Sequence, residues 1–334
     1  MPCVLITGAS GFIGSHLVEE GLKRGYSVFA AIRKTSSRRY LQDPRIQFLE
    51  LDLSSPVQLS EELSRCKSIG IRFDYIVHNA GTTRARRKDE YRRVNYLFTT
   101  FLVKTLQELT LVPGKFLLMS SLAAYGPGDP VSMEPVSEEK EPAPIDSYGR
   151  SKLEAERFLQ SLPGFPYLIL CPTGVYGPRE KDYYQFFRTV QKGFEPYIGT
   201  TKQRISFIFV KDLARLVFVA LESTITGKTW VVSDGEAYTS GDFSAIVKTA
   251  LQRKTFSFVL PLPVVRSFAV ILELLYTPLG KIPLLNREKV AILGSANWQC
   301  DPSVIFRDLG FSPDYTLRKG VEETVIWYRQ QGWL

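Results

Sequence analysis

The sequence predicts an α/β protein built on a doubly wound parallel sheet, with a smaller lobe toward the C-terminus. Three observations predict this fold class. Short runs rich in Val, Ile and Phe alternate with longer amphipathic segments through the first 120 residues. Three glycines, Gly8, Gly11 and Gly14, follow the first apolar run. A length of 334 residues accommodates one such domain together with an appended lobe.

Six apolar runs are expected to form the strands of the sheet, because each is short and bounded by turn residues. Helical segments separate most of these runs, which is typical of a doubly wound sheet. The expected strands are residues 3–6, 27–32, 46–49, 75–77, 115–119 and 167–170.

The regular alternation ends near Tyr176, where prolines interrupt short helices and strands. We therefore assign residues 1–175 to the first domain, and residues 176–204 and 236–334 to the smaller lobe. Residues 210–222 form an apolar segment typical of a core helix, so residues 205–235 are expected to return to the first domain. The lobe is thus discontinuous, and residues 310–334 are expected to end as an amphipathic helix.

Composition and charge exclude several classes of protein. Hydrophobic residues make up 44% and charged residues 23% of the chain, which excludes a disordered, collagen-like or coiled-coil protein. The formal net charge of +8 indicates anionic ligands without requiring nucleic acid. The four cysteines form no Cys-x-x-Cys pair, so neither a disulfide framework nor a metal site is expected. Since we see no signal peptide and no apolar run of about 20 residues, we expect a cytoplasmic protein.

The first glycines lie between an apolar strand and an apolar helix. Glycines permit a tight turn and a close approach of the backbone to a pyrophosphate, while the new helix supplies free N–H groups and the positive end of its dipole. In an alternating α/β chain this pattern predicts a Rossmann-type dinucleotide site, with plain packing of a turn as the alternative. The expected cofactor contacts here are Gly8, Ser10, Gly11, Phe12, Ile13 and Gly14.

The residues after the second strand indicate which nicotinamide cofactor is used. An NAD-specific site usually carries a carboxylate there, which holds the ribose 2′-hydroxyl. This chain has Arg33 and Lys34 instead, and a guanidinium can clamp a 2′-phosphate. NADP(H) is therefore the expected cofactor, with NAD(H) as the alternative if these are ordinary loop charges. Asp52 and Leu53 follow the third strand, where the carboxylate is expected either to accept from an adenine amino group or to close a turn.

Tyr148 and Lys152 are four residues apart, on the same face of an expected helix. A tyrosine with an ordinary pKa near 10 is a poor base at neutral pH, but an adjacent ammonium group and an oxidised nicotinamide would stabilise its phenolate. Tyr-x-x-x-Lys alone occurs often by chance. Together with the glycine segment far upstream, it predicts an acid-base pair in a nicotinamide-dependent oxidoreductase.

With these motifs, the chain resembles the extended short-chain dehydrogenase/reductase family, the epimerase- and dehydratase-like enzymes, over essentially its whole length. In this resemblance Ser121 matches the catalytic serine, whose hydroxyl would hold the substrate oxygen against the Tyr148 phenol. Asn95 matches the helix asparagine that supports the Lys152 end of the site. The resemblance implies that Tyr148 transfers the hydroxyl proton during hydride transfer and that Lys152 also holds the nicotinamide ribose. Further segments matching the cofactor lining contain Asn79, Ala80, Gly81 and Pro172.

Four positions depart from the members of that family that act on nucleotide sugars. Those members tend to have an arginine and an asparagine where this chain has Cys171 and Gly174, and often an Arg-Asp pair where it has Ile205 and Ser206. The chain more closely resembles the dihydroflavonol-reductase and 3β-hydroxysteroid-dehydrogenase branches, which handle apolar ketones and alcohols.

Two segments bear on substrates and partners. Residues 264–276 predict an apolar helix suited to covering an apolar pocket or touching a membrane surface, with plain core packing as the alternative. Six basic residues close in sequence to the expected active-site mouth are expected either to meet a phosphate-bearing substrate or to form a solvated helix face. They are Arg84, Arg86, Arg87, Lys88, Arg92 and Arg93.

The leading hypothesis is an NADP(H)-dependent oxidoreductase that interconverts a carbonyl and a secondary alcohol on a largely apolar small molecule. A nucleotide-sugar epimerase or reductase with the same Ser121, Tyr148 and Lys152 is the second hypothesis. A non-enzymatic redox-sensing or assembly subunit would keep the fold and the cofactor, but the complete Ser, Tyr and Lys set disfavours it. The resemblance further implies a homodimer through the helices bearing Asn95 and Tyr148.

Overall fold

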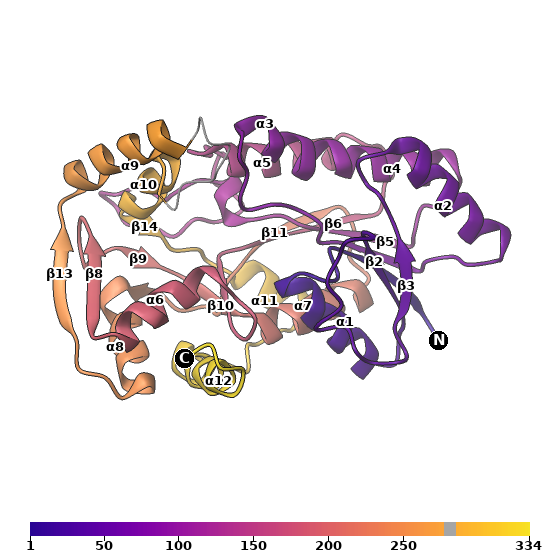
Figure 1. Cartoon of the computed structure of the whole chain (residues 1–334). Helices are drawn as coiled ribbons and strands as arrows, with labels where there is room; N and C mark the ends of the chain where they lie inside the picture. The colour runs from indigo at the N-terminus through magenta and orange to yellow at the C-terminus, as the bar shows by residue number, and fades with distance from the viewer. Residues whose placement is uncertain (277–284) are drawn as a thin grey trace.

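The computed structural model describes residues 1–276 and 285–334. Residues 277–284 fall in the segment 236–334 assigned to the smaller lobe, and they lie outside the described residues. A seven-stranded parallel sheet has the strand order β11-β6-β5-β4-β1-β2-β3. Helices flank this sheet (Figure 1). Its strands are β1 (Cys3–Thr7), β2 (Ser27–Ile32), β3 (Gln47–Glu50), β4 (Tyr75–His78), β5 (Lys115–Met119), β6 (Tyr167–Pro172) and β11 (Lys228–Val232).

The sheet confirms the predicted fold class, and the order of its strands indicates where a ligand is expected to bind. β1 pairs in parallel with β2 on one side and with β4 on the other. The winding of the chain therefore reverses between β3 and β4, and ligands of such sheets bind outside the carboxyl ends of the strands at this reversal. The segments after β1, β4 and β5 carry the predicted site residues to that edge.

Helices cover both faces of the sheet, because alternate residues of each buried strand point to opposite faces. Val4 and Ile6 belong to the hydrophobic core on one face, and Leu5 belongs to the core on the other. The first face is covered by α1 (Phe12–Lys23), α7 (Val210–Glu222) and α11 (Ser303–Leu309). The second is covered by α2 (Pro56–Ser68), α4 (Phe98–Glu108) and α5 (Ser147–Gln160).

The structure corrects several predicted boundaries and adds one strand. β1, β4 and β6 extend beyond the predicted runs, and β3 is shifted by one residue, while α7 matches the predicted 210–222. The seventh strand, β11, lies in the segment 205–235 and pairs in parallel with β6. The division into 1–175, 205–235 and the remaining lobe segments stays a prediction.

Most of the remaining elements surround an aromatic core that contains Tyr176, Phe187, Phe207, Phe243 and Tyr328. Short strands form three small sheets: β7 (Gly174–Tyr176) with β10 (Phe207–Phe209); β9 (Arg204–Ile205) with β12 (Tyr238–Thr239) and β14 (Asn297–Trp298); and β8 (Phe194–Ile198) with β13 (Phe256–Leu260). The helices are α6 (Asp182–Gln191), α8 (Ser240–Leu251), α9 (Leu262–Tyr276), α10 (Arg287–Gly294) and α12 (Leu317–Gln330). Of these, α9 and α10 pack around a separate small core of Val265, Ala269 and Val290.

Two of these helices refine the sequence analysis. The amphipathic helix expected within residues 310–334 is α12, which covers only 317–330. α9 begins two residues before the predicted segment 264–276, with Pro263 in its first turn, where a missing N–H removes no hydrogen bond. No helix among residues 1–276 and 285–334 has the length and apolar character needed to cross a membrane.

Candidate active site

The glycine turn between β1 and α1 is too tight for side chains. Gly8 has a φ of +65°, and its carbonyl accepts a hydrogen bond of 3.0 Å from the Gly11 N–H. A Cβ on Gly8 would lie 2.9 Å from the Ala80 backbone, and one on Gly14 would lie 2.1 Å from the Gly8 oxygen. The β1 turn, the β4 turn and α1 therefore approach one another as closely as a backbone permits.

The amino end of α1 fits the pyrophosphate of a dinucleotide. The helix starts at Phe12 after Gly11, and no side chain caps it. The N–H groups of its first turn are therefore available to an anion, which the helix dipole also favours. Ser10 and Ile13 are half-buried beside this turn.

Arg33 and Asp52 follow the neighbouring strands β2 and β3. Asp52 is exposed and accepts hydrogen bonds from the Ser54 N–H at 2.9 Å and the Ser54 hydroxyl at 2.6 Å. These bonds lower the pKa of Asp52, and the nearby charge of Arg33 lowers it further. Asp52 thus closes a turn, which is one of the two roles expected of it. Leu53 is half-buried. The Arg33 side chain is exposed.

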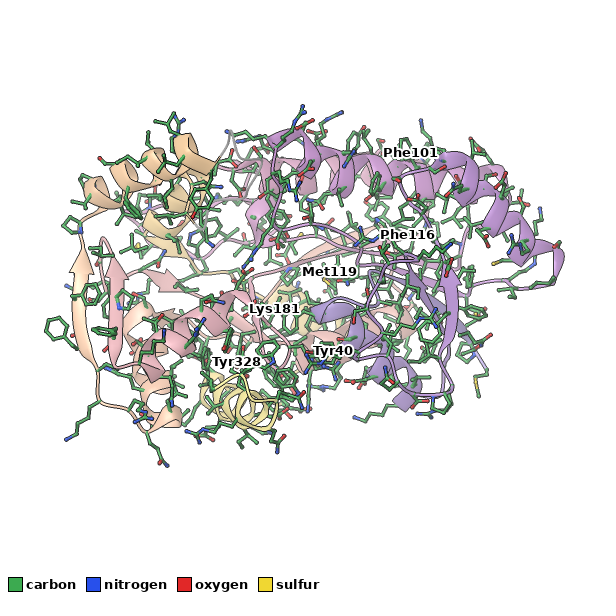
Figure 2. All side chains as sticks on the ribbon, viewed as in Figure 1. Tyr40, Phe101, Phe116, Met119, Lys181 and Tyr328 are labelled. Atoms are coloured by element: carbon green, nitrogen blue, oxygen red, sulfur yellow. The ribbon has the colours of Figure 1, made fainter. Side chains whose placement is uncertain are left out.

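Tyr148 and Lys152 lie together in the first turns of α5, which Asp146 caps by accepting from the Gly149 N–H at 2.8 Å. The Lys152 ammonium is buried, 5.9 Å from the centre of the Tyr148 ring. It donates a hydrogen bond of 2.8 Å to the carbonyl of Met119, near the centre of the molecule (Figure 2). The last residue of β5 therefore holds the lysine in place.

Asn95 connects the loop after β4 to α5. Its side-chain amide donates to the Thr82 carbonyl at 3.1 Å and to the Ser151 hydroxyl at 2.9 Å, and its Oδ1 accepts from the Thr82 N–H at 2.8 Å. Asn95 lies in a single π-helical turn, η1 (Arg93–Leu97), between α3 (Lys88–Arg92) and α4. A Cβ on Gly81 would lie 3.0 Å from the Asn95 Oδ1 and 3.2 Å from the Lys152 Nζ. Asn95, Gly81 and Lys152 are therefore neighbours in the structure.

Burial controls the charge of the Tyr148 and Lys152 pair. It raises the pKa of Tyr148 to about 12, although a hydrogen bond with Ser121 acts in the opposite direction. It lowers the pKa of Lys152 to about 8, although the nearby Glu156 raises it. Ser121, which starts the short helix η2 (Leu122–Ala124), also accepts a hydrogen bond of 3.2 Å from the Ala123 N–H. In this state the phenol keeps its proton at neutral pH and can donate it.

Sequence reasoning missed a buried chain of hydrogen bonds behind the β4 turn. The Ala80 N–H donates to the Thr7 hydroxyl at 3.1 Å, and the Thr99 hydroxyl donates to the Asn95 carbonyl at 2.8 Å. The His78 ring lies between these hydroxyls, with Nδ1 2.9 Å from Thr7 Oγ1 and Nε2 3.0 Å from Thr99 Oγ1. Because the Thr99 proton goes to Asn95, the pattern assigns the imidazole proton to Nε2 and makes Nδ1 an acceptor.

His78 is thus a neutral link between the cofactor turn and Asn95. Burial lowers the pKa of His78 to about 3, and the charge of Lys152 adds to the effect. The only sequence signal for this role is its position at the end of the fourth strand, directly before Asn79. Asn79 is half-buried there, with its Nδ2 3.5 Å from the Gly8 carbonyl oxygen.

A second buried group, Glu156, was also missed. It lies four residues after Lys152 and accepts hydrogen bonds from the Ser120 hydroxyl and, at 3.4 Å, from the Cys171 thiol. Burial raises the pKa of Glu156 to about 7, against the lowering effect of these two donors and of Lys152. The i, i+4 spacing from Lys152 is the signal that would have identified it.

The positions that depart from the nucleotide-sugar pattern are closed by other protein groups. Cys171 is fully buried in β6, where Pro172 ends the strand. A Cβ on Gly174 would lie 2.4 Å from the Tyr183 hydroxyl, so Tyr183 fills the space beside this glycine. The Ser206 hydroxyl is buried, donates to the Glu236 carbonyl at 3.0 Å and accepts from the Cys300 N–H at 3.3 Å. Cys171 and Ser206 therefore use their polar atoms inside the protein.

The basic segment between β4 and Asn95 forms ion pairs with surrounding elements. Arg84 pairs with Asp182 at the start of α6, Lys88 with Glu288 of α10 at 3.0 Å, and Arg92 with Glu154 of α5 at 2.7 Å. These basic side chains are exposed, so the pairs contribute little stability individually. They nevertheless connect Arg84 and the short helix α3 to three neighbouring helices.

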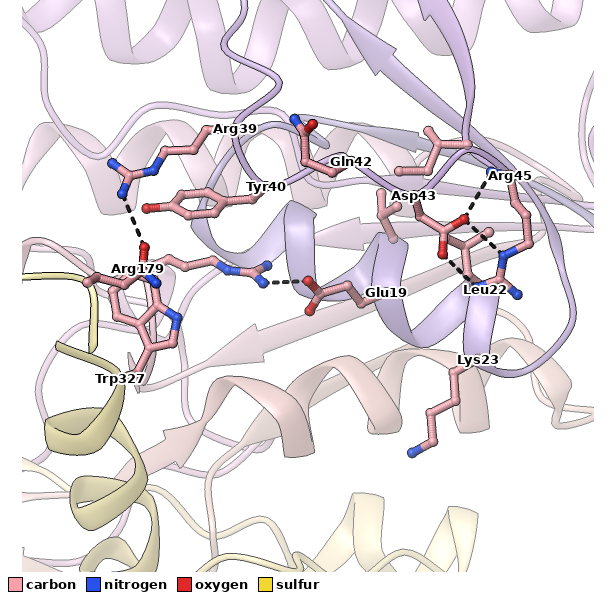
Figure 3. Close-up of a pocket in the computed structure, with 13 residues that line it drawn as sticks. Glu19, Leu22, Lys23, Arg39, Tyr40, Gln42, Asp43, Arg45, Arg179 and Trp327 are labelled. Carbon is pink, nitrogen blue, oxygen red and sulfur yellow. Dashed lines mark hydrogen bonds and ion pairs between the residues drawn. The ribbon is translucent and has the colours of Figure 1, made fainter. Parts of the chain in front are cut away.

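A cavity of about 500 Å³ lies away from these groups (Figure 3). It is bounded by α1, the loop between β2 and β3, and α12. The Arg179 guanidinium carbon lies 4.8 Å from the centre of the Tyr40 ring, and the guanidinium pairs with Glu19. The centres of the Tyr40 and Trp327 rings are 6.2 Å apart. Ser121, Tyr148 and Lys152 do not line this cavity, so it is separate from the candidate active site.

Comparisons with known proteins agree with this geometry. The model of the NAD dependent epimerase/dehydratase family matches residues 4–233. The chain is 27% identical to a UDP-glucose 4-epimerase of Vibrio cholerae over 328 residues, covering 96% of this chain and 94% of the relative. It is 26% identical to a decarboxylating sterol-4-alpha-carboxylate 3-dehydrogenase of Mus musculus over 342 residues, covering 97% and 90%.

Solved structures share the fold. A UDP-glucose 4-epimerase of Thermus thermophilus, in complex with NAD, superposes with a TM-score of 0.78 at 21% identity, covering 98% of this chain and 99% of that one. Together with the family match and the glycine turn, this leads to one conclusion. The chain belongs to the NAD-dependent epimerase/dehydratase family and is an NAD(P)-dependent enzyme of the extended short-chain dehydrogenase/reductase type.

Proposed function

We propose that this enzyme interconverts a carbonyl group and a secondary alcohol on a largely apolar small molecule, with Tyr148 as the acid and base. The observation that carries the proposal is that the buried Lys152 ammonium lies 5.9 Å from the centre of the Tyr148 ring, with the Ser121 hydroxyl close enough to lower the pKa of the Tyr148 phenol. A carbonyl oxygen accepting from both hydroxyls would be held for protonation. The bound nicotinamide supplies or accepts the hydride in this chemistry.

Each residue of the cluster has one task in this reaction. In reduction, Tyr148 gives its proton to the developing alkoxide and Ser121 stabilises that oxygen with a hydrogen bond. In oxidation, Tyr148 must first lose its proton, which a pKa of about 12 opposes, so the adjacent Lys152 charge is needed to favour the phenolate. Asn95 keeps the loop after β4 fixed against α5. We propose Gly8, Ser10, Gly11, Phe12, Ile13, Gly14, Asn79, Ala80, Gly81, Asp52, Leu53 and Pro172 as the cofactor contacts.

We propose NADP(H) as the preferred cofactor because Arg33 stands exposed at the end of β2, where NAD-specific sites carry a carboxylate. The exposed Asp52 nearby is already engaged by Ser54 and by the charge of Arg33.

The apolar substrate class is supported by the closed polar positions Cys171, Gly174 and Ser206, and by similarity to a sterol dehydrogenase. A nucleotide-sugar epimerase is the second candidate, because a UDP-glucose 4-epimerase is an equally similar relative over nearly the full chain. Both would use Tyr148 and Ser121, so the substrate pocket must decide between them.

A substrate panel tests the proposal. Turnover with NADPH is measured on ketones of increasing apolar size and on UDP-, GDP- and dTDP-sugars, with thermal unfolding of each mixture as a second readout. We expect kcat/KM to rise with apolar size, because each buried methylene contributes about 0.8 kcal/mol. We expect the nucleotide sugars to be neither converted nor stabilising. Stabilisation by one nucleotide sugar but not by its free nucleotide would favour the epimerase instead.

A further inference from the structure

Arg179, in the segment between β7 and α6, is held in a way that costs stability. Its backbone is in the left-handed region, with a φ of +76°, which strains a residue with a long side chain. Its side chain is only 12% exposed, and its Nε is buried without a hydrogen-bond partner in the described part of the chain. Backbone strain and an unpaired buried donor are both unfavourable, and strain of this kind is typical of residues with a functional task.

The Arg179 guanidinium joins two segments that border the proposed cofactor site. It donates a hydrogen bond of 2.9 Å to Ser15 Oγ and pairs with Glu19, and both of these residues are on α1. It also lies against Tyr40, in the loop between β2 and β3, with its carbon 4.8 Å from the ring centre. Figure 3 shows the Arg179 side chain extending alongside Tyr40 toward Glu19. One side chain therefore connects α1 to the loop that begins with Arg33.

Both connections lead to residues proposed to contact the cofactor. The Ser15 hydroxyl, which accepts from Arg179, donates to the Phe12 carbonyl at 2.9 Å in the first turn of α1. The free N–H groups of that turn are the proposed ligands of the pyrophosphate. Tyr40 lies in the same loop as Arg33, the proposed partner of the 2′-phosphate. Arg179 is thus placed to fix these two parts of the site relative to each other.

The backbone on either side of Arg179 is bound to neighbouring helices. The carbonyl oxygen of Pro178 lies 3.2 Å from Nε2 of His16, on α1. The carbonyl of Glu180 accepts a hydrogen bond of 2.9 Å from the Tyr328 hydroxyl, on α12. Contacts on both sides are what allow a strained residue to keep its conformation.

We propose that Arg179 is a positioning residue for the dinucleotide, which holds the first turn of α1 and the loop after β2 in the arrangement that binds the cofactor. The inference rests on the cofactor site proposed at the glycine turn, and it adds a residue distant in sequence that acts through Ser15, Glu19 and Tyr40. A planar guanidinium can donate to two acceptors and lie against an aromatic ring at the same time, which a lysine ammonium cannot do.

Cofactor titration of two full-length variants tests the inference. Arg179→Gly removes the guanidinium and relieves the left-handed backbone, whereas Arg179→Ala removes the guanidinium and keeps the strain. We expect the glycine variant to unfold at a higher temperature than the alanine variant. We expect both to bind NADPH and NADH about tenfold more weakly than the wild type, because the first turn of α1 serves both cofactors. Fluorescence titration and thermal unfolding without cofactor measure these quantities.

Two further variants test how the guanidinium acts. Arg179→Lys keeps the positive charge but not the planar fork, so we expect nearly the same loss of affinity as in Arg179→Gly. Tyr40→Leu keeps apolar bulk and removes the ring, so it should cause a smaller loss. Combined with Arg179→Gly, it should weaken binding no further, because both substitutions break the same link.

One control addresses the backbone and another addresses the cofactor site. Gln252, the C-terminal cap of α8, also has a left-handed backbone, with a φ of +56°. It belongs to no part of the proposed site, so Gln252→Gly should leave cofactor affinity unchanged. Gly11→Ala tests the site itself, because a Cβ there would lie 3.2 Å from the Gly8 oxygen at the start of α1. It should weaken both cofactors.

The outcomes separate the inference from the proposed site. If Gly11→Ala weakens binding but Arg179→Gly binds as the wild type does, the inference is wrong and the site stands. If Gly11→Ala also binds normally, the site is wrong and the inference falls with it. Wild-type affinity in Arg179→Lys would show that charge alone is sufficient and would overturn the positioning role. A loss in Arg179→Ala that Arg179→Gly recovers together with stability would overturn it as well, because affinity would then follow stability.

Discussion

The two ends of the proposed cofactor site differ in how their side chains are held. Around Tyr148 and Lys152, buried groups are linked by side-chain hydrogen bonds from Asn95 and His78. At the other end, Arg33 is exposed at the end of β2, and its charge lowers the pKa of the nearby Asp52. Interactions between buried groups are strong and costly to break, whereas an exposed charge is screened by water and salt.

This difference indicates which properties the fold protects. Proton transfer requires groups fixed to within a fraction of an ångström, and a buried hydrogen-bonded cluster provides that. A 2′-phosphate requires only a nearby positive charge, which one exposed loop residue can supply or remove. We therefore expect substitutions at the buried end to cost more than substitutions at the exposed end.

The largest effect is expected for Tyr148→Phe. Removing the proposed proton donor should lower kcat at least about 10²-fold, or about 2.7 kcal/mol, with cofactor affinity nearly intact. Steady-state kinetics on an active ketone and fluorescence titration of NADPH measure both. Tyr91→Phe is the matched control, because its ring lies 6.2 Å from that of Tyr148 and it also loses only a hydroxyl. Equal turnover in the wild type and Tyr148→Phe would refute the mechanism.

A smaller effect, on stability, is expected at His78. Its folded pKa of about 3 lies below the ordinary value near 6.5, so the unfolded chain binds this proton first. The stability that depends on neutral His78 is present above pH 6.5 and is lost as the pH falls toward 3. This group alone should remove about 2 kcal/mol between pH 8 and pH 5.

His78→Gln isolates that loss, because glutamine can bond both threonines and does not titrate. The difference in unfolding free energy between wild type and variant should shrink by about 2 kcal/mol from pH 8 to pH 5. Urea unfolding at the two pH values measures it. Parallel losses in both proteins would show that His78 takes up its proton in the folded state.

The smallest effect is expected at the exposed end. Arg33→Ala should weaken NADP(H) binding by about tenfold, or about 1.4 kcal/mol, and change NAD(H) binding little. Lys34→Ala, its exposed neighbour, is the control and should change both cofactors much less. Calorimetric titration of the wild type and the two variants with each cofactor gives the six affinities. Tighter binding of NAD(H) than of NADP(H) by the wild type would contradict the assignment of Arg33.

Local patterns were enough to predict the fold class. Alternating apolar runs located most strands of the central sheet, and the bounds of α7 matched the predicted 210–222. Such features are short in sequence, so periodicity and turn residues encode them. The sequence pattern could not predict that the apolar outer side of α9 is exposed. An apolar helix has the same sequence pattern whether its outer side is buried or exposed.

The sequence by itself determined the glycine turn, the Tyr148 and Lys152 spacing and the basic residue after β2, because each depends on neighbours a few residues apart. Only the tertiary structure placed His78 between Thr7 and Thr99, and Glu156 beside Ser120 and Cys171. Thr7 and His78 are 71 residues apart and lie on adjacent strands. Their contact depends on the order and register of the parallel sheet, which no local pattern specifies.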